Sequence, residues 1–113
     1  MDCLFCKIAE GVIPANIVFE DKDMLGFRDR NPQAPTHVLI IPKRHIPTLN
    51  DIETTDVELL GNMIVAAKQI ARAEGLSETG YRLNFNVNRD GGQTVFHIHL
   101  HILGGRSMAW PPG

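Results

Sequence analysis

The sequence predicts a single domain that combines a β-sheet with two helices. Three stretches carry this prediction. Histidines and apolar residues alternate over residues 94–103, which is the period of a strand whose side chains point to opposite faces. Residues 37–42 form a nearly continuous apolar, β-branched run typical of a central strand, and apolar residues recur at helical spacing between residues 56 and 74.

Size and composition fit one globular domain that spans residues 1–113. Apolar residues make up 43% of the chain and the formal net charge is −2, so we expect neither nucleic acid nor a membrane as a partner. No apolar run approaches the roughly 20 residues that span a bilayer, and residues 1–4 lack the basic start of a signal peptide. We therefore expect a cytoplasmic protein whose two cysteines are reduced.

A short helix is expected over residues 4–10, ended by Gly11 and Pro14. Cys3 and Cys6 are three positions apart, so they share one face of this helix. One pair of cysteines at this spacing can be half of a zinc site, a redox pair or a chance occurrence. The redox interpretation expects a preceding βαβ unit, which the sequence does not show.

Three strands are expected before the main helix. Residues 17–20 form the first strand and residues 24–29 the second, joined by a turn at 21–23. Residues 31–35 break the regular structure because two prolines remove backbone donors and restrict the residues before them. Residues 37–42 then form the third strand, which we place in the centre of the sheet because it is almost entirely apolar.

The main helix is expected over residues 56–74. Thr55 and Glu58 have the spacing of a capping box, and Gly75 ends the helix. Its apolar stripe covers one face of the sheet and belongs to the core rather than to a cofactor site. The stripe comprises Leu60, Met63, Ile64, Ala67, Ile70 and Ala71.

Residues 81–88 alternate between apolar and polar and form a fourth strand, which residues 89–93 join to residues 94–103 in a hairpin. The side chains of the last strand that we expect in the core are those of Phe96, Ile98, Leu100 and Ile102. Those expected on the opposite, polar face are His97, His99 and His101, together with Asn84 and Asn86 of the fourth strand.

Three of the five histidines of the chain thus lie in register on one strand. Neighbouring imidazoles on that face lie roughly 6–7 Å apart. The plain alternative is a face exposed to solvent, but lysine, threonine or glutamate would serve that purpose equally well without a pKa near neutrality. Imidazole can attack phosphorus, transfer a proton or bind a metal, so this face is the candidate reactive site.

The residues just before the histidines suit a phosphate group. Gly91 and Gly92 let backbone N–H groups approach a ligand closely, and a run of such amides can bind an anion. Thr94 adds a hydroxyl donor. This combination favours a phosphate held beside a nucleophilic histidine, although the two glycines also fit a plain hairpin loop.

A metal site is the competing interpretation. Three successive positions on one strand face span roughly 13 Å, which is too far for one zinc ion with Zn–N bonds of about 2.0–2.1 Å. The three histidines therefore cannot all bind the same ion. A separate Cys₂His₂ site could combine Cys3, Cys6, His45 and one of the three histidines.

The run from His97 to His101 resembles the His-x-His-x-His motif, with apolar x, of the histidine triad (HIT) superfamily. Segments along nearly the whole chain resemble its nucleotide-binding branch. They are residues 5–8, 13–14, 27–29, 31–37, 40–42, 91–93 and 103–113. Thr94 departs from the serine that is frequent in this branch, and Arg30 and Ala109 depart from it as well.

This resemblance implies an α+β fold, with a five-stranded antiparallel sheet, one long helix and one short helix. It implies a homodimer whose sheets join into a ten-stranded sheet. The implied activity is that of a purine nucleoside phosphoramidase, which cleaves the P–N bond of adenosine or other purine 5′-phosphoramidates to AMP-type nucleotides plus amine. The reaction passes through a nucleotidyl-histidine intermediate and needs no metal. The alternatives are a purine nucleotide-binding or scaffold protein with residual hydrolysis, and a zinc-dependent hydrolase.

The resemblance also implies roles for individual residues. His99 is the nucleophile, and His101 and His37 assist it. The expected nucleotide contacts are Asn86, Gly92, Gln93 and Thr94 at the phosphate, Asp29 at the ribose, Leu4, Phe5, Ile8, Ile13 and Phe27 at the base, and Trp110 near the site of the second subunit. A structural zinc ion is expected on Cys3, Cys6, His45 and His97. The alternative is two buried, inert cysteines and a surface His45.

Overall fold

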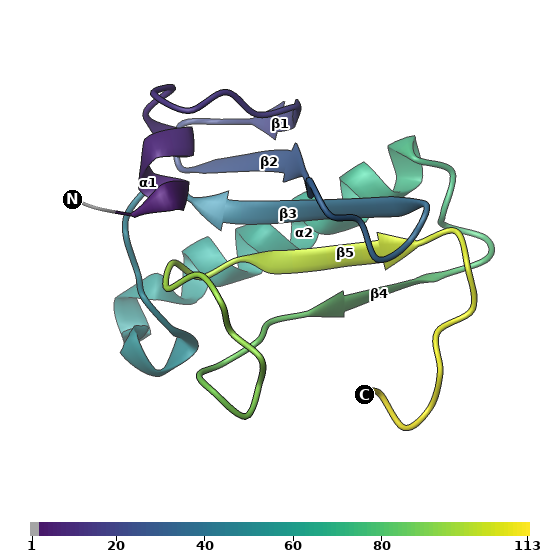
Figure 1. The fold of residues 1–113 in the computed structure, drawn as a ribbon. Helices are drawn as coiled ribbons and strands as arrows, with labels where there is room; N and C mark the ends of the chain where they lie inside the picture. The colour runs from purple at the N-terminus through teal and green to yellow at the C-terminus, as the bar shows by residue number, and fades with distance from the viewer. Residues whose placement is uncertain (1–2) are drawn as a thin grey trace.

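Five antiparallel strands form one sheet in the order β1-β2-β3-β5-β4 (Figure 1). The computed structural model describes residues 3–113, so Met1 and Asp2, where we expect no signal peptide, lie outside the described residues. The strands are β1 (Ile17–Glu20), β2 (Met24–Arg28), β3 (Thr36–Pro42), β4 (Tyr81–Asn84) and β5 (Leu100–Gly104). The predicted five-stranded antiparallel sheet with one long and one short helix is confirmed.

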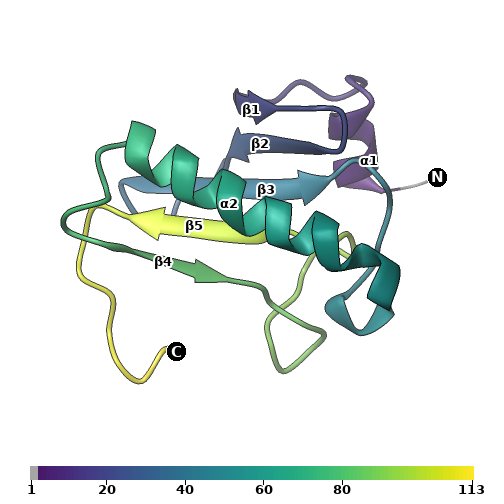
Figure 2. The same cartoon turned by 180° about the vertical axis from the view of Figure 1, so that it is seen from behind.

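The two helices lie on opposite faces of the sheet. The long helix α2 (Val57–Ala73) crosses one face (Figure 2), and the short helix α1 (Leu4–Ala9) packs on the other. Two 3₁₀ turns, η1 (Leu49–Asp51) and η2 (Thr54–Asp56), lead from β3 into α2. Within residues 3–113, neither helix is long and apolar enough to cross a membrane.

β3 occupies the centre of the sheet because both of its faces are apolar. It pairs with β2 on one side and with β5 on the other. Val38 and Ile40 pack in the core beneath α2, whereas Leu39 and Ile41 pack in a second cluster beneath α1. Burial on both faces explains why this strand reads as a continuous apolar run rather than as an alternating one.

The apolar stripe of α2 includes Ala66, which was not predicted, and lacks Ile64, which was, while Leu60 is partly buried against the core. The buried residues are Met63, Ala66, Ala67, Ile70 and Ala71, which follow the i, i+3, i+4, i+7, i+8 spacing of a single helix face. Ile64 was predicted in this stripe, but it is 45% exposed. It follows Met63 by one residue, about 100° around the helix, and therefore turns away from the sheet.

The predicted capping box at the start of α2 is wrong. Asp56, not Thr55, takes the N-cap position. The Asp56 carboxylate accepts a hydrogen bond from the Glu53 N–H at 2.8 Å and pairs with the Arg44 guanidinium, which closes the preceding 3₁₀ turn. At the other end, Gly75 has a φ of +77° and ends the helix as predicted.

The two final strands pair as predicted, but both are shorter than expected. β4 ends at Asn84 and β5 begins at Leu100, so residues 85–99 connect them without strand structure. Ile98, Leu100 and Ile102 are buried, whereas Phe96, also predicted in the core, is 50% exposed. The connecting segment turns at two residues with positive φ, Asn88 at 58° and Gly92 at 78°. These turns end the strand geometry before the first of the three histidines.

Candidate active site

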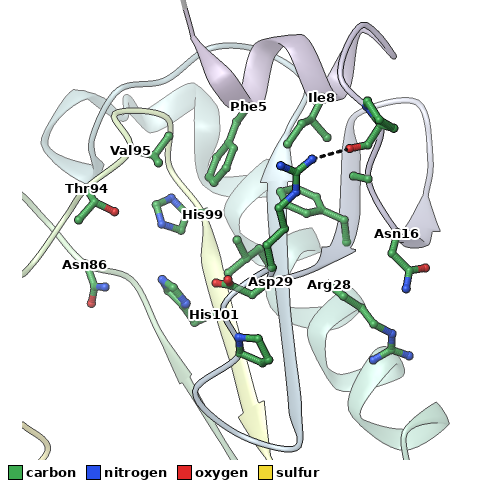
Figure 3. Close-up of a pocket in the computed structure, with 16 residues that line it drawn as sticks. Phe5, Ile8, Asn16, Arg28, Asp29, Asn86, Thr94, Val95, His99 and His101 are labelled. Atoms are coloured by element: carbon green, nitrogen blue, oxygen red, sulfur yellow. Dashed lines mark hydrogen bonds between the residues drawn. The ribbon is translucent and has the colours of Figure 1, made fainter.

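A cavity of about 880 Å³ opens on the face of the sheet opposite α2 (Figure 3). It lies on the side of the sheet occupied by Leu39, and His101 is directly opposite Leu39 in the β3–β5 ladder. Its lining residues are Phe5, Ile8, Pro14, Ala15, Asn16, Phe27, Arg28, Asp29, Arg30, Pro32, Leu39, Asn86, Thr94, Val95, His99 and His101. Strand period and register therefore place one reactive histidine in this cavity.

The cavity has a polar end and an apolar part. His99, His101, Asn86 and Thr94 lie together at one end, and Asn16 lies at the other (Figure 3). Between them, the apolar part is walled by the side chains of Phe5, Ile8, Phe27 and Leu39. This layout suits a ligand with an apolar or aromatic group at one end and a charged group at the other.

His99 is held as a neutral imidazole in one tautomer. Its Nδ1 lies 2.8 Å from the carbonyl oxygen of His97, and since a carbonyl only accepts, Nδ1 carries the proton. The lone pair of the neutral ring is then on Nε2. Burial lowers the pKa of His99, and the ring of Phe5 meets it edge-on at 5.0 Å between centroids. A neutral imidazole with a fixed lone pair is what nucleophilic attack requires.

A second chain of hydrogen bonds orients His101. The Gln33 backbone N–H donates to Nδ1 of His37 at 3.0 Å, so the neutral His37 ring carries its proton on Nε2. That Nε2 lies 2.8 Å from His101 Nδ1 and donates to it. The proton of His101 is therefore on Nε2, which is buried and has no hydrogen-bond partner in the described part of the chain. This unpaired N–H is a donor available to a ligand.

The histidines of the cavity are neutral at pH 7. The pKa of His101 is lowered to about 4, mainly by burial and further by the neighbouring His99 and His37. Burial also lowers the pKa of His37, against the opposing effect of the Asp29 carboxylate, whose Oδ2 lies 3.5 Å from His37 Nε2. A negatively charged ligand would oppose the effect of burial and raise the affinity of the His37–His101 pair for a proton.

A separate cluster of metal-ligating residues lies beside this cavity. Nδ1 of His97 is 3.5 Å from the Sγ atoms of both Cys3 and Cys6, and His45 Nδ1 is 3.2 Å from His97 Nδ1 and 3.3 Å from Cys6 Sγ. Ligands around a tetrahedral zinc ion lie roughly 3.3–3.8 Å apart, given Zn–N and Zn–S bonds of about 2.0–2.3 Å. The four ligand atoms therefore have nearly the separation that zinc requires.

The tautomer of His97 also suits a bound cation in this cluster. His97 Nε2 donates to the Pro42 carbonyl at 2.7 Å, which leaves the lone pair of the neutral ring on Nδ1, facing the cysteines. Burial, together with the neighbouring Cys3, raises the pKa of the Cys6 thiol to about 11 in the absence of an ion. A bound metal reverses this effect, because it stabilises the thiolate directly.

Asp29, His37 and His101 also bring their ligand atoms within 4.8 Å of one another. Their hydrogen bonds favour a different role. Because His37 Nδ1 accepts the Gln33 N–H, its Nε2 carries a proton and has no lone pair for a metal. The cysteine-containing cluster is therefore the better candidate for a metal site.

The structure brings most of the predicted site residues together. Eight of them line the cavity: Phe5, Ile8, Phe27, Asp29, Asn86, Thr94, His99 and His101. His37 adjoins it through His101. Five others lie outside its lining, namely Leu4, Ile13, Gly92, Gln93 and Trp110. Leu4 is 45% exposed and Trp110 is 84% exposed.

Gln93 has a supporting position instead. Its side-chain amide donates to the carbonyl oxygens of Pro47 at 2.7 Å and Val95 at 3.1 Å. Its side-chain oxygen accepts the Asn88 N–H at 2.9 Å. Gln93 thus fixes the turn that carries Thr94, while Gly92 supplies the positive φ of that turn.

Sequence reasoning missed eight residues of the lining: Pro14, Ala15, Asn16, Arg28, Arg30, Pro32, Leu39 and Val95. Leu39 could have been found, because it alternates with Val38 and Ile40 on the predicted central strand and so faces the side opposite α2. Most of the others lie on loops, where no periodicity indicates the direction of a side chain.

Residues 10–108 match the family model of the HIT domain. The match covers most of the chain, and the fold and the histidine arrangement described above agree with it. The chain therefore belongs to the HIT domain family.

Individual relatives are similar over nearly the whole length. The chain is 51% identical over 107 residues to the purine nucleoside phosphoramidase of Escherichia coli (strain K12), covering 95% of this chain and 90% of that protein. It matches the crystal structure of a HIT family hydrolase from Legionella pneumophila Philadelphia 1 with a TM-score of 0.98 and 68% identity, over 99% and 100% of the two chains. A zinc-bound histidine triad family protein from Mycobacterium smegmatis matches with a TM-score of 0.83 and 38% identity, over 94% and 76%.

The lowered pKa values predict how the stability of the fold depends on pH. An unfolded histidine titrates near 6.5 and folded His101 at about 4, so between these values the unfolded chain binds more protons. The free energy of unfolding, measured by urea denaturation with a chelator present, is expected to be highest above about pH 6.5. It then falls toward pH 4 by up to about 1.4 kcal/mol per pH unit for each such histidine.

A His101→Asn variant tests whether His101 causes this loss of stability at low pH. Because the variant lacks one titrating group, its free energy of unfolding is expected to depend less steeply on pH. An equal slope in the variant and the unaltered protein would contradict the lowered pKa of His101.

Proposed function

We propose that this protein is a purine nucleoside phosphoramidase, which hydrolyses the P–N bond of purine nucleoside 5′-phosphoramidates. The observation that carries the proposal is His99, whose Nδ1 is hydrogen-bonded to a backbone carbonyl and whose Nε2 lone pair is therefore free to attack phosphorus. The 51% identity to a protein named purine nucleoside phosphoramidase supports the same conclusion.

In the first step, Nε2 of His99 attacks the α-phosphorus and the P–N bond breaks, which forms a nucleotidyl-histidine. The leaving nitrogen takes a proton and departs as an amine. The His37–His101 pair, protonated from solvent under the influence of the bound phosphoryl charge, supplies this proton through His101 Nε2. The new positive charge on His99 is stabilised because its Nδ1–H remains bonded to the His97 carbonyl.

In the second step, water attacks the phosphorus of the intermediate and the bond to His99 Nε2 breaks. The proton of the water returns to the His37–His101 pair, so the site is restored and the nucleotide is released. Both steps balance without a metal ion. Thr94 and Asn86 supply donors at the polar end of the cavity, where charge develops on the phosphoryl oxygens.

The remaining contacts follow from the layout of the cavity. We assign the ribose hydroxyls to Asp29, which lies between the histidines and the apolar part (Figure 3). We assign the purine base to the compartment walled by Phe5, Ile8 and Phe27. Gly92 and Gln93 position the phosphate end indirectly, through the turn before Thr94. Leu4, Ile13 and Trp110 remain predicted contacts that lie outside this lining.

The proposed substrate is a single small nucleotide in the cytoplasm, rather than nucleic acid or a membrane. A cavity of about 880 Å³ has the size of a small-molecule site. The net charge of −2 offers no excess of positive charge for a polyanion.

The His99→Ala variant tests the nucleophile. With adenosine 5′-phosphoramidate as substrate, release of AMP is expected to fall by at least about 10³-fold, because no other group can form the covalent intermediate. Chelator is expected to leave the activity of the unaltered protein intact. A His99→Gly variant with added imidazole is the control for folding, since free imidazole can occupy the gap and restore part of the activity.

Two outcomes would contradict this proposal. Loss of activity on chelation would support a zinc-dependent hydrolase. Absence of AMP release together with tight AMP binding would support a nucleotide-binding or scaffold protein.

We further propose that Cys3, Cys6, His45 and His97 hold a structural zinc ion. The separations of their ligand atoms, the lone pair on His97 Nδ1 and the similarity to a zinc-bound histidine triad protein support this assignment. The ion would tie α1 to the loop after β3 and to the segment before β5.

Elemental analysis tests the zinc site. Protein purified from zinc-containing medium is expected to hold about one zinc per chain, and a chelator is expected to lower its Tm by at least about 5 °C. A Cys6→Ser variant is expected to contain no zinc and to show a Tm that chelator no longer changes. Metal-free protein whose Tm is insensitive to chelator would contradict the proposal.

We also propose that two copies form a homodimer with one continuous ten-stranded sheet. β4 is the last strand in the sheet order, so its outer edge is unpaired within the described chain. On the face of the same sheet (Figure 2), α2 exposes apolar side chains, with Val57 at 70%, Val65 at 51% and Ile64 at 45% exposure. An unpaired strand edge together with exposed apolar side chains favours pairing with a second copy.

Sedimentation velocity tests the dimer. The unaltered protein is expected to sediment as a dimer at micromolar concentration, whereas Ile64→Glu is expected to sediment as a monomer because it would bury an unpaired charge. Val12→Glu, at a residue that is 68% exposed in the loop after α1, is the matched control and is expected to remain dimeric. A monomeric unaltered protein would contradict the proposal.

A further inference from the structure

Arg30 lines the cavity and reaches the segment between α1 and β1. It follows β2, and its Nη2 donates to the carbonyl oxygen of Pro14 at 3.3 Å, on the segment between α1 and β1. This bond is the dashed line in Figure 3. Both Arg30 and Pro14 line the cavity, and the bond between them lies on its solvent-exposed side.

The residues near Arg30 place it beside the part of the cavity that we assign to the purine base. The group that it reaches, Pro14, adjoins Ala15 and Asn16, at the end opposite Thr94 and Asn86 (Figure 3). The other lining arginine, Arg28, is bound at 2.6 Å to Glu74, the C-cap residue of α2, and is thereby held toward the end of the helix. Arg30 therefore places a cation beside an otherwise largely apolar compartment.

The guanidinium keeps most of its hydrogen-bonding capacity. An arginine side chain has five N–H donors and no acceptor, and the described residues offer Arg30 only the Pro14 carbonyl. That bond is long and exposed to solvent, so the side chain can turn toward a ligand at little cost. Donors that point into a nucleotide site select for bases with acceptors on the facing edge.

Purines differ in this property. Guanine presents two adjacent acceptors, O6 and N7, which match the fork of an arginine. Adenine presents N7 beside the N6 amino group, which is itself a donor and opposes an N–H group. We infer that Arg30 selects the base and that this protein prefers guanosine over adenosine 5′-phosphoramidates. The inference rests on the proposed function for the position of the base.

The experiment compares the kcat/KM values for guanosine and adenosine 5′-phosphoramidate. The unaltered protein is expected to favour guanosine by about 10-fold, the lower part of the range for one arginine–guanine pair. In Arg30→Met, which has a similar length and no donors, the ratio is expected to fall to about 1, mainly through KM for guanosine. Arg30→Lys keeps the charge without the fork and is expected to give an intermediate ratio.

Arg89→Met is the matched control for loss of one positive charge. The Arg89 side chain is 93% exposed, pairs with Asp90 and is not part of the cavity lining, so this variant is expected to keep the ratio of the unaltered protein. Equal kcat/KM values for the two substrates in the unaltered protein, or the same ratio in Arg30→Met, would overturn the inference.

Calorimetry with GMP and AMP separates this inference from the proposed activity. Tighter binding of GMP that Arg30→Met abolishes would support base selection even if no phosphoramidate is cleaved. Equal binding of GMP and AMP, together with normal cleavage of both phosphoramidates, would overturn base selection and leave the proposed function intact.

Discussion

Hydrogen bonds from the backbone to imidazole rings determine what the histidines of this protein can do. The Pro42 carbonyl accepts from His97 Nε2 and the His97 carbonyl accepts from His99 Nδ1. The Gln33 N–H donates to His37 Nδ1. Each of these bonds fixes which ring nitrogen carries the proton in the neutral ring. Three histidines of the same chemical type are thereby prepared for the three proposed roles of metal ligand, nucleophile and proton carrier.

The sheet makes these bonds possible because it holds the partners in register. β3 carries His37 near one end and the Pro42 carbonyl at the other, and β5 places His101 opposite Leu39 between them. Core side chains pack against both faces of β3, so its ends are held rigidly. A shift of one residue between β3 and β5 would turn His101 toward α2 and remove it from the cavity.

Much of the fold could be predicted because its signals are periodic. The apolar run of β3, the alternation around His101 and the helical stripe of α2 each have one physical explanation, burial of one or both faces. The errors arose where turn geometry or loop contacts override periodicity. Phe96 alternates correctly with Ile98, but the positive-φ turn at Gly92 ends the strand pattern, and β5 begins only at Leu100. The His-x-His-x-His spacing indicated a reactive site, yet no spacing indicates that His97 contacts Cys3 instead of lining the cavity or that Arg30 reaches Pro14.

Nitrogen-15 NMR of the histidine rings, with long-range correlations to the ring carbon-bound protons, tests the central claim most directly. It reports which nitrogen of each neutral imidazole carries the proton. At pH 7 in the absence of nucleotide, the structure predicts a protonated Nδ1 for His99 and a protonated Nε2 for His37, His97 and His101. A protonated Nε2 on His99 would contradict the account, because the nitrogen that faces the substrate would then have no lone pair with which to attack phosphorus.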